Sequence, residues 1–383
     1  VIRQAVRQGM KHLGKQFVMG RTIDEAIKRA KEAEKAGYTY SYDMLGEAAH
    51  THEDALRYYQ SYETAIHAIG KKAKATSPET APGLSVKLSA LHPRYELAQR
   101  QIAVPVLVER LHALAVLAKK YNIGLTVDAE EADRLELSLD IIEAVYSSTD
   151  LSGWEGFGLA VQAYQKRAPY VIDWLIDLAK KHGRKIMVRL VKGAYWDTEV
   201  KNAQAMGFDS YPVYTRKNNT DVSYIACMKK LLDARSVIYS QFATHNAHSL
   251  ATVIELAGDD EGYEFQCLHG MGRPLYDQVV GKKKLNIPCR IYAPVGQHED
   301  LLAYLVRRLL ENGANTSFVN RITDEGEPID KIIEDPVARV AGLTTKPHPH
   351  IPLPKEIYGP SRINARGINL ANNNELEALE KGL

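Results

Sequence analysis

The 383-residue sequence has few cysteines, no long apolar run and almost no net charge. The cysteines, Cys227, Cys267 and Cys289, are widely separated and lack the spacing of metal ligands, which suits buried thiols in a reducing cytosol. No run approaches the roughly 18 apolar residues that span a bilayer, and no signal peptide is visible. Because Lys plus Arg total 49 against 47 for Asp plus Glu, the net charge of +2 gives no reason to expect a nucleic-acid partner.

The sequence also lacks the glycine-rich fingerprints of the common nucleotide-binding folds. Neither G-x-G-x-x-G nor a Walker A pattern is present, so any dinucleotide must be held without a Rossmann turn. The chain starts with Val1 rather than Met, and we therefore expect it to be an excerpt of a longer protein.

Short apolar runs followed by segments of helical periodicity occur eight times between about residue 38 and residue 312. The chain exceeds the usual size of one core, so it forms either two domains or one large α/β architecture. Repeated strand-helix units favour a (β/α)8 barrel over an open sheet. The predicted strands cover residues 38–45, 84–89, 124–128, 157–162, 186–191, 240–245, 263–268 and 289–293, and the clearest amphipathic helices between them cover 53–69, 104–121, 132–145 and 170–181.

Three segments lie outside this simple repeat. An N-terminal helical segment, residues 1–37, includes a predicted helix over 22–36 that Gly37 ends. The longest crossover, residues 195–239, is expected to form a lid or ligand loop. The stretch after about residue 340 is proline-rich and non-periodic, so we expect the barrel to occupy 38–340 and a linker to occupy 341–383.

Polar side chains gather where the predicted strands end, which is where a barrel places its active site. Any one of them can be a strand-end cap or a solvated loop residue, but such endings recur on all eight strands. The residues are Asp43, Glu47, Lys87, Asp128, Gln162, Arg189, Lys192, Thr244, His245, Asn246, Gln266, His269 and Tyr292.

The residue types restrict the chemistry. A buried arginine such as Arg189 is costly without a partner, and its alternative role is a structural ion pair. The strand-end histidines accompany amides and cations more than carboxylates, so we expect no metal. A Schiff-base aldolase using Lys87 or Lys192 stays open. A large anionic ligand fits better, with Arg, Lys and Gly193 at phosphates, amides at ring or ribose edges, and aromatics for stacking.

The segment 301–313, LLAYLVRRLLENG, reads as a helix with a broad apolar surface interrupted by two arginines. Neighbouring helix positions differ by about 100°, so Arg307 and Arg308 approach a ligand from different directions and can clamp one carboxylate. The alternative is an ordinary pair of surface arginines. The apolar positions are Leu301, Leu302, Leu305, Leu309 and Leu310.

Six long motifs in this order resemble the proline dehydrogenase domain of bacterial bifunctional proline utilization proteins. They are VKLSALHPRYE at 86–96, DAEEADRLE at 128–136, AVQAYQKR at 160–167, MVRLVKGAYWDTE at 187–199, FATHNAH at 242–248 and RRLLENGANTSFV at 307–319. The resemblance covers roughly residues 20–345. It implies a distorted (β/α)8 barrel that holds FAD and has the eighth helix over the barrel mouth. It also implies that the protein oxidises L-proline to Δ1-pyrroline-5-carboxylate.

The resemblance also assigns roles to matching positions. Arg189 corresponds to an arginine near flavin N5, and Lys87, Arg307 and Arg308 to the groups that hold the substrate carboxylate. Glu47 matches a carboxylate that pairs with the first of those arginines. The walls around the substrate ring match Tyr195, Leu268, Tyr292 and Tyr304, and the remaining flavin-lining positions match Asp128, Gln162, Val191, Lys192, Gly193, Ala194, Trp196, Arg216, Thr244, His245, Asn246, Gln266, Cys267, Leu268 and Glu311.

The resemblance further implies partners and a cellular place. Electrons pass to a membrane ubiquinone, and the protein is cytoplasmic and peripherally associated with the inner membrane when reduced. The tail after residue 345, with LPKEIYGPSRINARGINL, resembles a linker toward an aldehyde dehydrogenase domain of the full-length polypeptide. Two rival functions stay open, an aldolase-like barrel using Lys87 and a non-catalytic flavin- or ligand-binding barrel.

Overall fold

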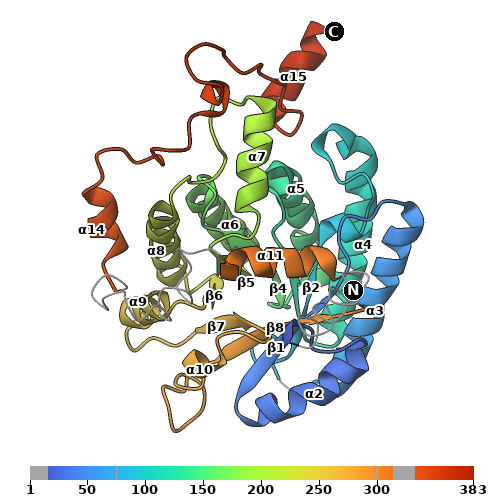
Figure 1. Ribbon diagram of the computed structural model, residues 1–383. Coiled ribbons are helices and arrows are strands. Elements are labelled where there is room, and N and C mark those ends of the chain that lie inside the picture. Colours follow the sequence, from blue (N-terminus) through green and yellow to red (C-terminus); the bar gives the residue numbers. More distant parts are fainter. Residues whose placement is uncertain (1–15, 75, 298–300, 314–332) are drawn as a thin grey trace, which may run out of the picture.

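The computed structural model describes residues 16–74, 76–297, 301–313 and 333–383 (Figure 1). Eight parallel strands close into a barrel in sequence order, with the last strand paired to the first. This confirms the predicted (β/α)8 fold. The strands are β1 Tyr38–Met44, β2 Gly83–Val86, β3 Gly124–Val127, β4 Phe157–Gln162, β5 Ile186–Val191, β6 Ile238–Ala243, β7 Tyr263–Leu268 and β8 Cys289–Val295.

The predicted strand boundaries are correct for β4, β5 and β7 and differ elsewhere by a few residues. The second strand ends early, and Ser89 lies in a 3-10 turn instead. His245 lies beyond the end of β6. These polar residues leave the sheet because parallel pairing stops where the loops of the barrel mouth begin.

A ring of helices surrounds the strands, as Figure 1 shows. The α-helices are α2 Ile23–Lys35, α3 His52–Lys72, α4 Arg100–Lys120, α5 Leu135–Tyr146, α6 Ala168–His182, α7 Trp196–Met206, α8 Lys217–Asp233, α9 Ala247–Ala257, α10 Arg273–Tyr276, α11 Leu302–Gly313, α14 Pro336–Ala341 and α15 Asn373–Gly382. The 3-10 turns are η1 Leu88–Ala90, η2 Leu97–Gln99, η3 Ala132–Arg134, η4 Thr149–Leu151 and η5 Pro354–Glu356.

Local sequence explains where several helices begin and end. The Thr22 side chain accepts a hydrogen bond from the Glu25 amide at the start of α2. Thr51 and Asp54 form a reciprocal capping box at the start of α3. Gly183 adopts φ 58° after α6, a left-handed conformation that glycine tolerates at a helix end.

One helix of the outer ring is unusually apolar for its length. Among the described residues, the helical stretch Leu97–Lys120 is long and apolar enough to cross a bilayer by length and composition alone. It contains no uninterrupted apolar run of such length, because Glu109, Arg110 and His112 interrupt it, as the sequence analysis expected. In the barrel, α4 packs beside α3 and α5 and buries Leu107 and Leu111 fully.

The segment predicted as a linker, 341–383, contains the helix α15, which the sequence analysis did not identify. The rest of this segment runs over α7 and α8 with little regular structure. The Tyr211 hydroxyl donates to the Pro352 carbonyl at 2.7 Å, and the Asn364 amide donates to the Gln204 carbonyl at 2.7 Å. Backbone and side-chain hydrogen bonds therefore attach the tail to the fifth crossover.

Candidate active site

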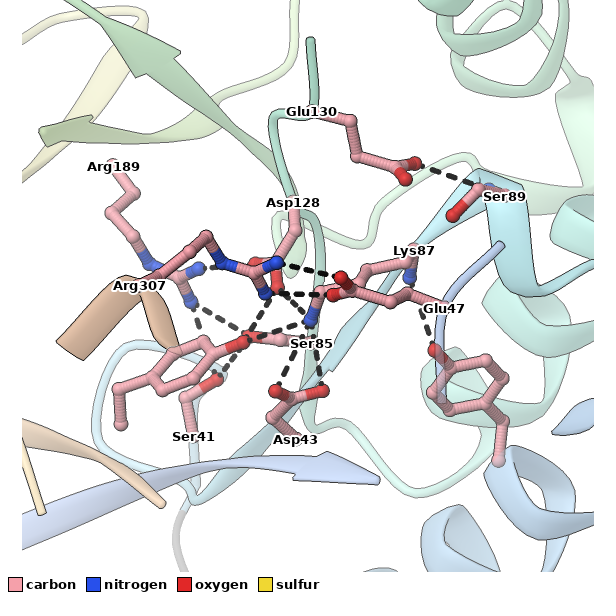
Figure 2. Close-up of polar contacts among 12 residues, drawn as sticks. Ser41, Asp43, Glu47, Ser85, Lys87, Ser89, Asp128, Glu130, Arg189 and Arg307 are labelled. Atoms are coloured by element: carbon pink, nitrogen blue, oxygen red, sulfur yellow. Dashed lines mark hydrogen bonds and ion pairs between the residues drawn. The ribbon is translucent and has the colours of Figure 1, made fainter. Parts of the chain in front are cut away.

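Charged side chains from four strands meet inside the carboxyl end of the barrel (Figure 2). Successive side chains in a strand point to opposite faces, so Ser41 and Asp43 of β1 share one face. The same alternation places Ser85 of β2 on one face with Lys87, which directly follows the end of that strand. These side chains project inward, because they contact Arg189 of β5 and each other across the barrel.

Lys87 is the centre of this group. Its ammonium donates to both carboxylate oxygens of Asp43, at 3.2 and 3.1 Å, and to Asp128 at 3.0 Å. The Tyr292 hydroxyl lies 3.2 Å from the same nitrogen. The exposed fraction of Lys87 is only 6%. Burial lowers the pKa of Lys87, but its anionic and phenolic neighbours outweigh burial and raise the pKa well above the ordinary value, so the ammonium stays charged.

Arg189 has the partners that its burial requires. The guanidinium donates from Nη1 to Asp128 at 2.6 Å and from Nε to Gln266 at 2.7 Å. Its Nη2 lies 2.8 Å from the Ser85 hydroxyl and 3.3 Å from that of Ser41. A guanidinium has five N–H bonds, so within the described part of the chain these contacts leave one N–H of Nη1 for a ligand.

Tyr292 and Asp128 join the two cations. The Tyr292 hydroxyl donates to Asp128 at 2.6 Å, and its ring lies 5.1 Å from the Arg189 guanidinium carbon. Burial raises the pKa of Asp128, but Lys87 and Arg189 outweigh it and hold the pKa below its usual range. Asp43 lacks a bond to Arg189, and burial raises its pKa. Two cations and two carboxylates therefore balance beneath the barrel mouth.

Helix α11 lies across the end of the barrel in Figure 1 and carries the predicted arginine pair. Arg307 donates to both oxygens of Glu47 at 2.6 and 2.7 Å, so the ion pair that the resemblance implied is formed. The Arg307 guanidinium also lies 5.1 Å above the ring of Tyr195. Burial opposes ionisation of Glu47, yet Arg307 outweighs it and lowers the Glu47 pKa.

Arg308 is 8% exposed and lies 5.4 Å from the centre of the Tyr304 ring. Leu301 and Leu305 are buried beside Tyr304, as predicted for the apolar surface of this helix. Leu302 is 60% exposed, so its predicted place on that surface was wrong. It lies outside the buried stripe because it is turned by about 100° from Leu301 around the helix axis. The predicted positions Leu309, Leu310 and Glu311 lie outside the residues whose side chains are described.

A second group of cations lies at the end of β5. Lys192 donates to Asp221 at 2.5 Å, and Lys217 reaches the other oxygen of the same carboxylate at 3.0 Å. Burial lowers the pKa of Lys192. Gly193 has φ +139°, and a Cβ there would lie 2.5 Å from the Tyr164 ring. Only glycine fits this turn without displacing the tyrosine.

Several residues that were predicted to contact a ligand instead form hydrogen bonds with the neighbouring backbone. The Gln162 amide bridges the Glu130 carbonyl, at 2.7 Å, and the Ala194 amide, at 3.2 Å. Asn246 caps α9, and the His245 Nε2 accepts from the Leu268 amide at 3.0 Å.

Four further predicted side chains contact neighbours within the fold. The Thr244 hydroxyl accepts from the Asn246 amide, and the Trp196 indole donates to the Tyr214 carbonyl. Arg216 donates to the Pro347 carbonyl, while the Cys267 thiol faces Cys289 on β8 at 3.9 Å. These contacts shape the loops around the site.

Sequence reasoning missed Ser41, Ser85, Glu130 and Glu264. Ser41 and Ser85 precede Asp43 and Lys87 by two positions, so strand alternation was a usable signal for them. Glu130 is buried, accepts from the Ser89 amide at 3.1 Å and pairs with Arg134. Glu264 is the second residue of β7, so it lies near the amino end of the strand, whereas the predicted site residues were taken from the carboxyl ends. Among described residues, no cluster of three or more His, Cys, Asp or Glu could hold a metal.

The proline dehydrogenase family profile matches residues 26–321. The chain belongs to the proline dehydrogenase family. It is 57% identical over its whole length to the "Bifunctional protein PutA" of Klebsiella aerogenes and 55% identical to that of Rhizobium meliloti. It spans 30% and 31% of those relatives' lengths. The "Proline dehydrogenase 1" of Bacillus subtilis (strain 168) is 28% identical over 80% of this chain and 88% of its own.

Comparison with solved structures identifies the same family. The fold superposes with a TM-score of 0.91 and 52% identity on a proline utilization A structure with proline bound in remote sites, covering 99% of this chain and 39% of that one. The proline utilization A of Bdellovibrio bacteriovorus, inactivated by N-propargylglycine, superposes with a TM-score of 0.89 and 30% identity, covering 99% of this chain and 40% of that one. The family and the barrel are therefore established for this chain.

Proposed function

We propose that this protein oxidises L-proline to Δ1-pyrroline-5-carboxylate with FAD as cofactor, in the first step of proline catabolism. The observation that carries the proposal is the placement of Arg307 and Arg308 over an inner group that contains Lys87 and Arg189. A small amino acid with one carboxylate and an apolar ring suits this combination of cations and tyrosines.

The residues around the barrel mouth fit a flavin dinucleotide. The remaining N–H of Arg189 can donate to a ring nitrogen, and Lys192 with Lys217 supplies positive charge for a diphosphate. Bound FAD would accept a hydride from the substrate carbon next to nitrogen at its N5 atom. The proposed contacts are Asp128, Gln162, Arg189, Val191, Lys192, Gly193, Ala194, Trp196, Arg216, Thr244, His245, Asn246, Gln266, Cys267, Leu268 and Glu311.

The substrate carboxylate is the anchor in this proposal. Lys87, Arg307 and Arg308 hold it by charge-assisted hydrogen bonds. Glu47 already neutralises Arg307, which reduces the contribution of Arg307 to the binding free energy. Tyr195, Leu268, Tyr292 and Tyr304 form the walls that orient the ring.

The same cations assist the substrate amine. An amine with a pKa near that of lysine, roughly 10, is mostly protonated at neutral pH and must lose that proton before hydride leaves. The cations that hold the carboxylate favour the neutral amine, and the neighbouring carboxylates Asp43, Asp128 and Glu47 reduce this effect. With FAD bound, Arg189 would stabilise the negative charge that the flavin gains when it accepts the hydride.

The aldolase alternative is disfavoured by the environment of Lys87. A Schiff-base lysine must lose its proton to act as a nucleophile. Asp43, Asp128 and Tyr292 instead raise the pKa of Lys87 well above its ordinary value. Lys192 has a lowered pKa but remains bound to Asp221 at 2.5 Å.

Further parts of the proposal concern the whole protein. We propose ubiquinone as electron acceptor, an aldehyde dehydrogenase domain in the same polypeptide, and a cytoplasmic enzyme that associates with the inner membrane when reduced. The similarity to bifunctional relatives about three times longer supports the second domain. We propose no nucleic-acid binding through this region.

The product tests the activity directly. FAD-loaded protein incubated with L-proline and a soluble quinone should form Δ1-pyrroline-5-carboxylate, which o-aminobenzaldehyde traps as a coloured adduct. D-proline serves as the control. Absence of the adduct from protein that contains FAD would contradict the proposed reaction, and borohydride trapping of substrate on Lys87 would support the aldolase.

A further inference from the structure

A buried chain of hydrogen bonds runs from Arg189 into the interior of the barrel. The Gln266 carbonyl oxygen accepts from Arg189 Nε at 2.7 Å, and its amide nitrogen donates to Glu264 Oε1 at 2.9 Å. Arg290 completes the chain by donating to the two oxygens of Glu264 at 2.7 and 3.0 Å. Gln266, Glu264 and Arg290 are 1%, 0% and 3% exposed.

The chemistry of Glu264 sets the direction of the amide. An ionised carboxylate accepts hydrogen bonds and donates none, so Gln266 must present its amide nitrogen to Glu264. Its carbonyl oxygen then faces Arg189. The flipped amide would set N–H against N–H on one side and oxygen against oxygen on the other, and both groups would be buried without partners.

Glu264 is itself fixed in place. Arg290 donates to the Ala81 carbonyl at 2.6 Å and to the Glu79 carbonyl at 2.7 Å, which ties it to the segment before β2. Gln241 on β6 donates to Glu264 Oε1 at 2.9 Å. The carboxylate is thus held from three strands and cannot turn away from Gln266 without breaking bonds in a dry interior.

We propose that Gln266, oriented by Glu264, is a positioning residue that fixes the Nε side of Arg189. Among the described residues, the other hydrogen bonds of Arg189 come from its Nη atoms, so the Gln266 bond is the one that holds the Nε edge of the guanidinium. This inference rests on the proposed function, in which Arg189 lies beside the flavin, and it replaces direct cofactor contact by Gln266 with a role through Arg189.

The matched variants are Gln266→Leu and Gln241→Leu. Both remove one donor to the same Glu264 oxygen from a side chain that is 1% exposed, but only Gln266 contacts Arg189. In FAD-loaded protein, Gln266→Leu should weaken the preference for reduced over oxidised flavin about tenfold, which lowers the two-electron midpoint potential by about 30 mV. Gln241→Leu should leave the potential unchanged even where both variants melt earlier.

Double variants separate a role through Arg189 from direct contact with the flavin. In an Arg189→Met background, Gln266→Leu should cause no further shift, because the residue through which it acts is gone. A shift of the same size in both backgrounds would overturn the inference and place Gln266 against the flavin. An equal shift in Gln241→Leu would overturn it as well, since that residue has no bond to Arg189.

Conservative replacement supplies a rescue. Gln266→Glu in its protonated form can donate to Glu264 and accept from Arg189, as the amide does. Once ionised, the new side chain places its carboxylate against that of Glu264, and the hydrogen bond between them is lost. The midpoint potential of this variant should equal that of the parent at low pH and fall below it as pH rises through the pKa of the new carboxyl. A constant difference at all pH values would contradict the assignment.

A final readout needs no cofactor. In flavin-free protein, hydrogen exchange of the Arg189 Nε–H, followed by NMR with labelled arginine, should accelerate at least tenfold in Gln266→Leu and stay unchanged in Gln241→Leu. Unchanged exchange in both would overturn the inference. Failure of every preparation to take up FAD, with the exchange result as expected, would instead contradict the proposed function alone.

Discussion

Replacing Arg308 by Met removes a charge from the proposed carboxylate clamp and keeps most of the side chain's apolar volume. Arg308 is 8% exposed, so water cannot easily substitute for the lost group. A hydrogen bond to a charged partner is worth about 1.5 to 3 kcal/mol. The dissociation constant of tetrahydrofuran-2-carboxylate, which keeps the carboxylate and ring of proline but has no amine, should therefore rise roughly ten- to a hundredfold. Titration followed by the flavin spectrum measures it.

Two neighbouring variants serve as controls, because they should change the affinity for the analogue in opposite directions. Arg307→Met should weaken binding less, because Glu47 already holds Arg307 at 2.6 and 2.7 Å. Glu47→Gln should tighten binding, because it leaves the Arg307 charge to the ligand. FAD content should change little in all three. If both arginine variants bind the analogue normally but melt much earlier, the arginines are structural and the clamp is wrong.

Three further predictions concern other parts of the site. Gly193→Ala should reduce FAD affinity, because its Cβ would lie 2.5 Å from the Tyr164 ring; unchanged affinity by equilibrium dialysis would contradict this. Asp43→Asn should lower stability by about 1 kcal/mol, because Lys87 loses a charged hydrogen-bond partner but keeps Asp128, and a denaturant midpoint equal to that of the parent would refute it. Burial raises the pKa of Glu199 to about 7, above roughly 4.3 in the unfolded chain, so the folded state binds the extra proton and stability falls as pH rises between these values. Glu199→Gln should make the melting temperature less dependent on pH across this window. An unaltered dependence of the melting temperature on pH would show that Glu199 is not its cause.

Periodicity and burial arguments predicted the barrel well. The strands β4 and β5 are largely apolar on both faces, which parallel strands covered by helices require, and the predicted limits of β4, β5 and β7 match the structure. The cost of burying an arginine required partners for Arg189, and Asp128 and Gln266 are two of them. Helix α15 escaped prediction because it is short, its apolar stripe consists of little more than Leu376 and Leu379, and none of its residues is fully buried.

The site was predicted less completely than the fold. Lys87, Asp128, Arg189 and Tyr292 do converge, because all follow or end strands of one barrel. Which strand-end side chains turn toward the centre depends on loop geometry that sequence does not reveal; Asn246 caps a helix instead. Glu264 was missed because its partners, Arg290 and Gln241, lie on other strands, and only the closed barrel brings them together.

The anaerobic flavin spectrum with and without L-proline tests the central claim most directly. FAD-loaded protein should lose its visible flavin absorbance when L-proline is added without oxygen, and tetrahydrofuran-2-carboxylate should shift the spectrum without bleaching it. Flavin that stays oxidised in the presence of L-proline, or protein that stays colourless and inactive after FAD addition, would contradict the account.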